Sequence, residues 1–249
     1  MSVISLTQEK PAVSVQKYSL GSATISYKNT CYDEASQVLF IHVHEDEAAS
    51  INAAKSFLDS IQKYCLLELQ YRKKRLIHFV YKSRSYWVDP NRIHTITGAK
   101  ANLKLLNGKY PDAVLKQVVA HSAKIKRKFI IDKKLVVALH NNTNASYSAL
   151  WYIKDGRYAQ DAADVFINKN NDPDDFFYTT SRSYFIYLKQ KGYNVVLEHP
   201  TRVRDNGSLS VYCASKKIPY LNIEVQDDHY EMQQEMLQVA QELIENFGY

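Results

Sequence analysis

The sequence predicts an α/β fold: a three-layer α/β/α sandwich around a mixed, mostly parallel sheet. Short apolar, β-branched runs recur along the chain, and between them apolar residues repeat at helical spacing. Most of these runs are too uniformly apolar to face water on one side. We therefore expect helices to cover both faces of the sheet.

The elements follow in order along the chain. The predicted strands are residues 37–43, 65–71, 75–81, 135–139, 193–199 and 219–225. Helical patterns run from Ile51 to Cys65, over 113–127 and 183–190, in a short segment after Ser208, and in a final helix with Met232, Met236, Val239, Leu243 and Ile244. Polar loops are expected at 89–98, 141–148 and 168–175, where they can shape a site at the strand ends.

Length and composition predict one globular domain. The chain has 249 residues, 45% of them hydrophobic and 23% charged, and we expect a single catalytic domain over 1–249, with 1–30 as an N-terminal extension or edge strands. No apolar run approaches the roughly 20 residues that a membrane span requires. We expect no membrane span and a cytoplasmic location; a periplasmic or secreted protein is the alternative if a signal was removed.

Cysteine usage and charge bound the chemistry further. Cys31, Cys65 and Cys213 form no CxxC pair, and their odd number argues against a complete disulfide framework, so we expect buried thiols. The net charge is +6, and the densest basic runs lie at 73–78 and 123–128. No recognisable nucleic-acid-binding module accompanies these runs, so we expect no nucleic-acid partner.

A candidate metal site lies where the first apolar strand ends. His44 and Glu47 are three residues apart at this point, and imidazole and carboxylate are both normal zinc ligands. His140 directly follows the apolar run 135–139, so it is the best candidate for a third ligand. The same stretch offers a second frame, His42 with Glu45, and His42 could neighbour or replace His44.

Two further clusters could act on a substrate. Arg84, Asn91 and Arg92 surround an apparent turn and could hold a carboxylate by forked hydrogen bonds; the alternative is a pair of surface arginines beside a turn. Glu224 interrupts a strand that otherwise reads as buried, so its charge needs either a function or a structural ion pair.

Together the four blocks resemble the zinc carboxypeptidases and their aspartoacylase and succinylglutamate desuccinylase relatives. The blocks are HxxE at 44–47, R-x6-N-R from Arg84 to Arg92, the isolated His140, and the late strand residue Glu224. Their order and approximate spacing agree over roughly residues 37–225. The resemblance also extends to small bacterial murein-peptide amidases, which share the compact length.

The resemblance implies a role for each matching position. His44, Glu47 and His140 would bind one Zn²⁺ per chain, and Glu224 would be the general base and acid. Arg84, Asn91 and Arg92 would bind the substrate carboxylate, with Arg84 also polarising the scissile carbonyl. Leu209 would line the pocket for the terminal side chain, where an aliphatic residue gives no sign of a preference for basic side chains.

Two departures from the family pattern bear on the substrate. Glu45 stands where the family commonly has glycine, and the flexible tyrosine of the digestive enzymes falls near Arg202, with no evident counterpart. Arg202 and Arg204 could instead extend the carboxylate-binding surface. The second ligand sphere could use Asp46, Asp89 or a backbone carbonyl.

The expected activity is hydrolysis of an amide bond next to a carboxylate-bearing residue. The first expectation is a carboxypeptidase on short peptides, cell-wall peptides among them, and the alternative is an N-acyl amino acid deacylase. A non-catalytic binding protein on the same fold is the rival reading. The substrate would be a small molecule with a free carboxylate; the sequence leaves the oligomeric state open.

Overall fold

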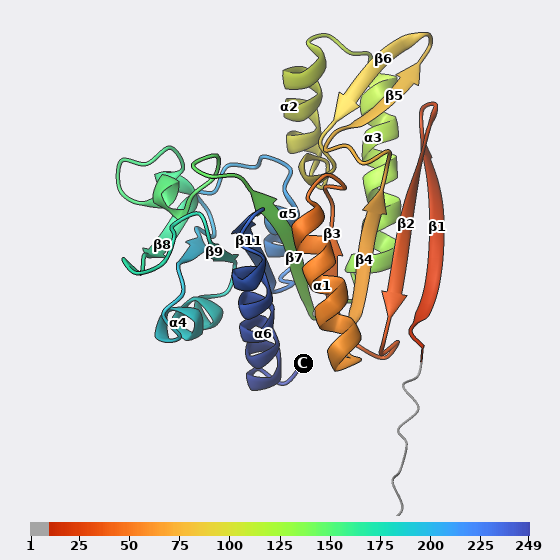
Figure 1. Ribbon diagram of the computed structural model, residues 1–249. Coiled ribbons are helices and arrows are strands. Elements are labelled where there is room, and N and C mark those ends of the chain that lie inside the picture. The colour runs from red at the N-terminus through yellow and green to blue at the C-terminus, as the bar shows by residue number, and fades with distance from the viewer. Residues whose placement is uncertain (1–9) are drawn as a thin grey trace, which may run out of the picture.

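A mixed sheet forms the middle layer of the protein. The computed structural model describes residues 10–249, so the first nine residues of the predicted N-terminal extension lie outside the described part. Within it, a nine-stranded sheet has the order β1-β2-β4-β3-β7-β11-β9-β10-β8 (Figure 1). The strands are β1 (Ala12–Leu20), β2 (Ala23–Cys31), β3 (Val38–His42), β4 (Cys65–Gln70), β7 (Leu135–Asn142), β8 (Ala162–Phe166), β9 (Phe176–Thr179), β10 (Val195–Glu198) and β11 (Tyr220–Gln226).

The centre of the sheet is parallel and buried. β3 pairs in parallel with both β4 and β7, and β7 pairs in parallel with β11. Antiparallel pairings appear further out, between β1 and β2, β2 and β4, β11 and β9, and β10 and β8. Every residue of β3 and β11 is buried, as expected for strands covered on both faces. The predicted α/β fold with a mixed sheet is confirmed.

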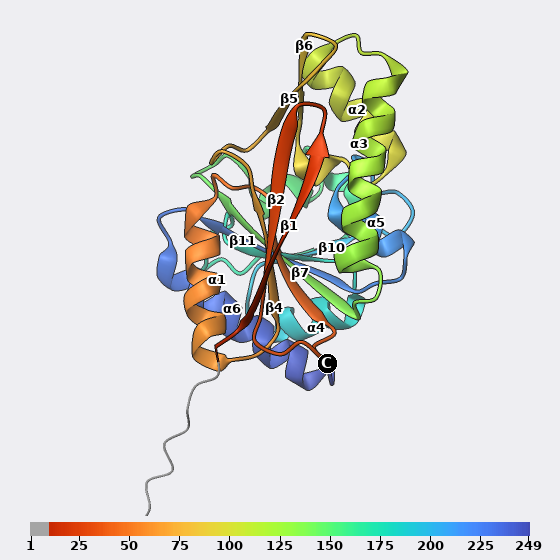
Figure 2. The ribbon, with the colours of Figure 1, turned by 90° about the vertical axis from the view of Figure 1, so that its right-hand side faces the viewer.

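Helices cover both faces of this sheet (Figure 2). On one face lie α1 (Ala48–Ile61), α4 (Arg182–Gln190) and α6 (Tyr230–Asn246), which pack on Phe40, Leu139 and Ile223. On the other lie α3 (Asp112–Ile125) and α5 (Leu209–Ser215), which pack on residues such as Ile41 and Ala138. Neighbouring strand residues contribute to opposite cores because side chains alternate along a strand. A π-helical turn, η2 (Lys126–Ile130), continues α3.

Part of the predicted sheet is a separate hairpin. The predicted strand 75–81 corresponds to β5 (Ile77–Tyr81), which pairs only with β6 (Arg84–Val88) in a two-stranded sheet. This hairpin lies beside α2 (Ile96–Asn107), near the top of the molecule in Figures 1 and 2. Its apolar residues Phe79 and Val88 are buried against the main body, which explains why the strand reads as a core strand.

The sequence predicts no helix or strand at the positions of several elements. α2 begins within the expected loop 89–98, with the Thr95 side chain accepting a hydrogen bond from the Gly98 N–H as an N-cap. Gly98 is required there because a Cβ atom would lie 2.0 Å from the Cα of Gly207. β8 and β9 are only five and four residues long, too short for a clear alternation pattern.

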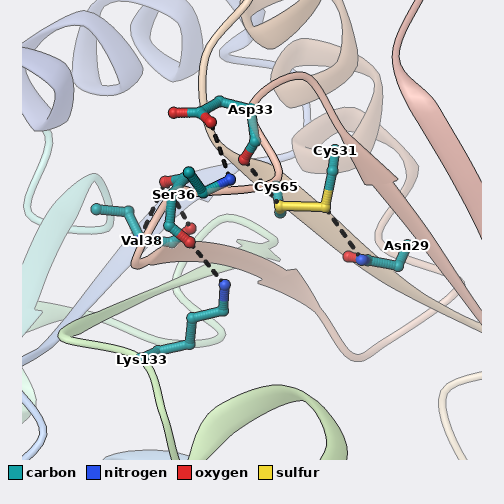
Figure 3. Close-up of a disulfide and its surroundings, with 8 residues drawn as sticks. Asn29, Cys31, Asp33, Ser36, Val38, Cys65 and Lys133 are labelled. Atoms are coloured by element: carbon teal, nitrogen blue, oxygen red, sulfur yellow. Dashed lines mark hydrogen bonds between the residues drawn. A yellow bond between two sulfur atoms is a disulfide. The ribbon is translucent and has the colours of Figure 1, made fainter.

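Cys31 and Cys65 form a disulfide, so the expectation of three thiols is wrong for this pair (Figure 3). The antiparallel register of β2 and β4 sets the two residues opposite each other, with their Cα atoms 4.0 Å apart. The amide of Asn29 faces the Cys31 sulfur at 3.1 Å. Cys213 remains a buried free thiol, as expected. The sequence could not pair the cysteines because the pairing depends on which strand is the neighbour of β2.

Among the helices of residues 10–249, none combines the length and apolar character that crossing a bilayer requires.

Candidate metal centre and its cavity

Three predicted ligands converge at the carboxyl ends of the central strands. His44 lies two residues beyond β3, Glu47 directly precedes α1, and His140 lies within β7. Their potential ligand atoms all lie within 4.8 Å of one another. Both imidazoles turn Nδ1 toward the Glu47 carboxylate, at 2.8 Å for His44 and 2.9 Å for His140. Glu47 makes no side-chain cap to α1, so its carboxylate is free to face them.

The electrostatics of this cluster favour positive charge. Burial would lower the pKa of His44, but the carboxylates of Glu47 and Asp89 outweigh it and raise that pKa to about 9. Burial would likewise raise the pKa of Glu47, yet the two imidazoles hold it well below its ordinary value. Two imidazole nitrogens and one carboxylate are the donor set of a catalytic zinc site, which keeps one position open. The residues present therefore fit a zinc ion.

Asp89 holds the ring of His44, the first predicted ligand. The other ring nitrogen of His44, Nε2, lies 2.9 Å from Asp89 Oδ1. Asp89 is itself held, since its backbone N–H donates to the Asn102 side chain and its carboxylate accepts from the Asn91 N–H. A carboxylate behind a ligand imidazole fixes the ring and its tautomer. Of the three candidates for this position, the structure selects Asp89, whereas Asp46 is exposed.

His42 and Glu45 support the site from outside it. His42 is the last residue of β3, and its Nε2 lies 2.9 Å from the backbone oxygen of Glu47, so it is a buried neighbour rather than a ligand. Burial lowers the pKa of His42 to about 4. The Glu45 carboxylate turns away and accepts hydrogen bonds from the backbone N–H groups of Tyr71 and Lys73. It thereby fixes the loop between β4 and β5.

Glu224 lies beside the ligands on β11. The register pairs it with His140, and its side chain faces the same cavity as the metal ligands. Asn222 Nδ2 donates to Glu224 Oε1 at 2.9 Å, and no Lys or Arg forms an ion pair with Glu224 among residues 10–249. Burial raises the pKa of Glu224 above its ordinary value. A buried carboxylate with a raised pKa in a cavity is typical of a general base.

Asn91 and Arg92 also reach the cavity. They belong to a 3₁₀ turn, η1 (Pro90–Arg92), which follows the predicted turn at Asp89. The side-chain oxygen of Asn91, Oδ1, accepts a hydrogen bond from the Leu209 N–H at 3.1 Å, while its Nδ2 lies 3.4 Å from His140 Nε2. Arg92 lines the cavity, and no described carboxylate forms an ion pair with it. Its guanidinium is therefore available to an anionic ligand.

Arg84 does not line the cavity, whereas Arg75 does. Arg84 is exposed at the tip of the β5–β6 hairpin, where its guanidinium lies 5.5 Å from the ring centre of Tyr86. The five residues of β6 are extended, so the five steps from Arg84 to Asp89 span about 16 Å. The antiparallel pair Ile77–Val88 instead brings Arg75 back to the cavity, where it forms a 2.5 Å ion pair with Glu47.

Leu209 does not line the cavity either. Its side chain is 1% exposed and belongs to the core between the sheet and α5. Its neighbours Ser208 and Ser210 line the cavity instead, with their hydroxyl oxygens 2.9 Å apart. Successive residues in the first turn of α5 point in different directions. The predicted lining residue, Leu209, is therefore one position away from the side chains that face the cavity.

The cavity has a volume of about 700 Å³ and a polar, aromatic lining. The segment between β7 and β8 contributes Tyr147, Tyr152 and Tyr158, which the sequence did not single out among 19 tyrosines. Arg204 lines the cavity as well, but its guanidinium donates two hydrogen bonds to Asp161 from Nε and Nη2, at 3.1 and 2.8 Å to Oδ2. Arg202 is exposed and does not line the cavity.

The protein is similar to several solved structures. Thrombin-activatable fibrinolysis inhibitor aligns with a TM-score of 0.50 and 12% identity over 91% of this chain and 67% of its own. An aspartoacylase family protein from Mesorhizobium loti aligns with a TM-score of 0.45 and 10% identity, over 96% of this chain and 68% of its own. A proposed metallopeptidase from Shewanella baltica aligns with a TM-score of 0.44 and 11% identity, over 91% of this chain and 84% of its own. No family model and no curated protein matches the sequence. The carboxypeptidase-like fold that the sequence blocks implied is confirmed.

Proposed function

We propose that the protein is a zinc-dependent hydrolase that cleaves an amide bond next to a carboxylate-bearing residue, acting as a carboxypeptidase on short peptides, cell-wall peptides among them. One observation carries the proposal. The three donors of His44, Glu47 and His140, the buried carboxylate of Glu224 and the guanidinium of Arg92, which forms no ion pair with a described carboxylate, all face one cavity.

His44, Glu47 and His140 would hold the zinc ion, with Asp89 behind His44. A bound zinc ion supplies Lewis acidity, which lowers the pKa of a water molecule and polarises the substrate carbonyl. The carboxylate of Glu47 faces both imidazoles already, so little rearrangement of the donors is needed.

Glu224 would move the proton. Its carboxylate accepts a proton from water as the water oxygen adds to the carbonyl carbon, and it then delivers that proton to the leaving amine nitrogen as the C–N bond breaks. The raised pKa of Glu224 suits both roles, because a carboxylate with a higher pKa is a stronger base toward the water proton. Asn222 fixes the carboxylate through its 2.9 Å hydrogen bond.

Arginine side chains would bind the substrate's charges. Arg92, with Asn91 beside it, would hold the free carboxylate by charge-assisted hydrogen bonds. Arg75 lies next to Glu47 at the cavity wall, so we assign to it, in place of Arg84, the polarisation of the scissile carbonyl and the stabilisation of the oxyanion that develops from it.

Metal content tests the site directly. Wild-type protein purified without chelator is expected to contain near one zinc per chain by mass spectrometry, and His44→Ala and His140→Ala are expected to lose it. His78→Ala, on the β5–β6 hairpin, is the matched control and should retain the metal. Wild-type protein that binds no zinc even when zinc is supplied would overturn the proposal.

A substrate panel tests the reaction. The zinc-loaded protein is expected to release the last residue from acetylated dipeptides with a free carboxyl terminus, and to leave the corresponding C-terminal amides intact. Single N-acyl amino acids in the same panel separate a peptidase from a deacylase. Zinc binding without turnover of either class would leave a non-catalytic binding protein.

A further inference from the structure

One buried carboxylate beside the cavity has no part in the proposed reaction. Glu198 is the last residue of β10 and is 3% exposed. The Tyr178 hydroxyl donates a hydrogen bond to its Oε2, and no cationic side chain among the described residues is near enough to stabilise its charge. Burial of a carboxylate without a cationic partner is costly. Burial accordingly raises the pKa of Glu198, and its Oε1 has no hydrogen-bond partner among the described residues.

The strand register places Glu198 on the cavity side of the sheet. Tyr178 of β9 is paired with Val196 on one side and with Asn222 on the other, and side chains of paired residues share a face. Glu198 is two residues beyond Val196 and therefore shares that face. The Tyr178 hydroxyl, which lines the cavity, donates to Glu198 Oε2 at 2.9 Å. Glu198 thus lies directly behind the lining.

The hydrogen bonds leave this part of the lining rich in acceptors. Because Tyr178 gives its only hydroxyl proton to Glu198, its oxygen has lone pairs left for the cavity. Asn222 donates an amide proton to Glu224, and its buried Oδ1 has no hydrogen-bond partner among residues 10–249. We call Tyr178, Ser210 and Asn222, with Glu198 behind them, the acceptor floor.

The acceptor floor lies at the right distance from the proposed chemistry. Glu224, Asn222 and Tyr220 are alternate residues of β11, and all three line the cavity. Alternate residues of a strand are about 7 Å apart, so the floor begins one such step from Glu224. The Asn91 side chain also bonds the start of α5, next to Ser208 and Ser210. A residue whose carboxylate is held at Arg92 would therefore direct its side chain toward the floor.

We propose that the acceptor floor binds a cationic side chain, an ammonium or guanidinium group, and that Glu198 determines this specificity. The proposal rests on the proposed function, because it takes the residue held by Arg92 as the one whose side chain enters the floor. The arginines of the cavity do not fill this role. Arg204 is paired with Asp161, and the exposed Arg157 packs over the rings of Trp151 and Tyr158.

Binding of single amino acids tests the floor without turnover. L-lysine and L-norleucine have side chains of similar length, and only lysine carries an ammonium group. Calorimetry on the zinc-loaded protein is expected to show lysine binding at least about tenfold more tightly, as for a charge-assisted hydrogen bond. Glu198→Gln should abolish most of this ratio. Asp164→Asn, which removes an exposed carboxylate from the adjacent strand β8, should retain it.

Hydrolysis gives the second readout. Acetyl-alanyl-lysine should be cleaved faster than acetyl-alanyl-norleucine and acetyl-alanyl-glutamine by the wild type, and the order should collapse in Glu198→Gln with an unchanged thermal midpoint. Equal binding of lysine and norleucine, with both weakened by Arg92→Ala, would overturn the floor and leave the proposed function standing. A preference for glutamine would overturn the cationic assignment. No binding of either amino acid together with no cleavage would overturn both proposals.

Discussion

The strand ends of the central sheet and the β5–β6 hairpin contribute to the same cavity in different ways. His44, His140 and Glu224 lie on or just after strands whose register is fixed by two neighbours each. Arg75 instead reaches the cavity from the base of the hairpin, while Arg84 points into solvent at its tip. Parallel strands place their carboxyl ends together in any such fold, whereas a hairpin places its residues according to where its turn falls.

This difference explains which site residues sequence spacing can locate. Counting residues from Arg84 to Asn91 matches the family pattern, yet the intervening β6 is extended and carries Arg84 away. The turn of the hairpin falls at Lys82 and Ser83, which have positive φ values. Continued past its last pair, the register that this turn sets places residue 75 opposite residue 90. Long-range pairing, rather than linear distance, brings Arg75 to Glu47.

The strongest test of the strand-end region is Glu224→Gln. The amide keeps the shape and the bond to Asn222 but cannot accept the water proton, so kcat should fall about 10²- to 10⁴-fold with zinc content unchanged. Turnover is measured on acetylated dipeptides with protein shown by mass to be free of wild type. A kcat within twofold of the wild type would remove Glu224 from the mechanism.

Substitution of Arg75 and Arg84 distinguishes the base of the hairpin from its tip. Arg75→Ala should lower kcat/KM about 10²- to 10³-fold, because it removes a charged donor from the cavity wall. Arg84→Ala serves as the matched control and should stay within about twofold, since an exposed guanidinium over a tyrosine ring contributes little. The reverse order of effects would restore the assignment made from sequence spacing.

Asp89→Asn should produce a smaller change in the metal site itself. Loss of the carboxylate behind His44 is expected to weaken zinc binding about 10- to 100-fold, measured by competition with a chromogenic chelator. Asp46→Asn removes an exposed carboxylate two residues from His44 and should leave the zinc affinity unchanged. Equal effects of the two variants would mean that charge near the site matters, and not the hydrogen bond to His44.

The disulfide should affect stability and hardly affect the reaction. The bond between Cys31 and Cys65 closes a loop with a sequence separation of 34, so Cys31→Ser should lower the free energy of unfolding by about 3–4 kcal/mol. Urea titration with and without reductant measures this, and Cys213→Ser is a buried control outside the pair. If reductant leaves the wild-type midpoint unchanged, the pair is not oxidised in the protein.

The sequence located the parallel centre and the His44–Glu47–His140 cluster, because buried strands produce apolar runs that end at the candidate site. It also placed Asn91 and Arg92 in a turn that reaches the cavity. The prediction that Leu209 lines the pocket was wrong, since a shift of one residue along a helix turns a side chain from the cavity to the core. The sequence did not single out Glu198, because its proposed role depends on the absence of a cationic partner among the described residues. Only the packed structure shows which groups surround it.

The contact between Gly98 and Gly207 makes the cavity sensitive to residues that never touch a ligand. A methyl group at position 98 would collide with the backbone of Gly207, one residue before Ser208. Relief of that collision would shift the start of α5, and with it both the hydrogen bond from Leu209 to Asn91 and the hydroxyls of Ser208 and Ser210. In a mutational scan, position 98 would therefore register as a determinant of substrate choice although it lies outside the cavity lining.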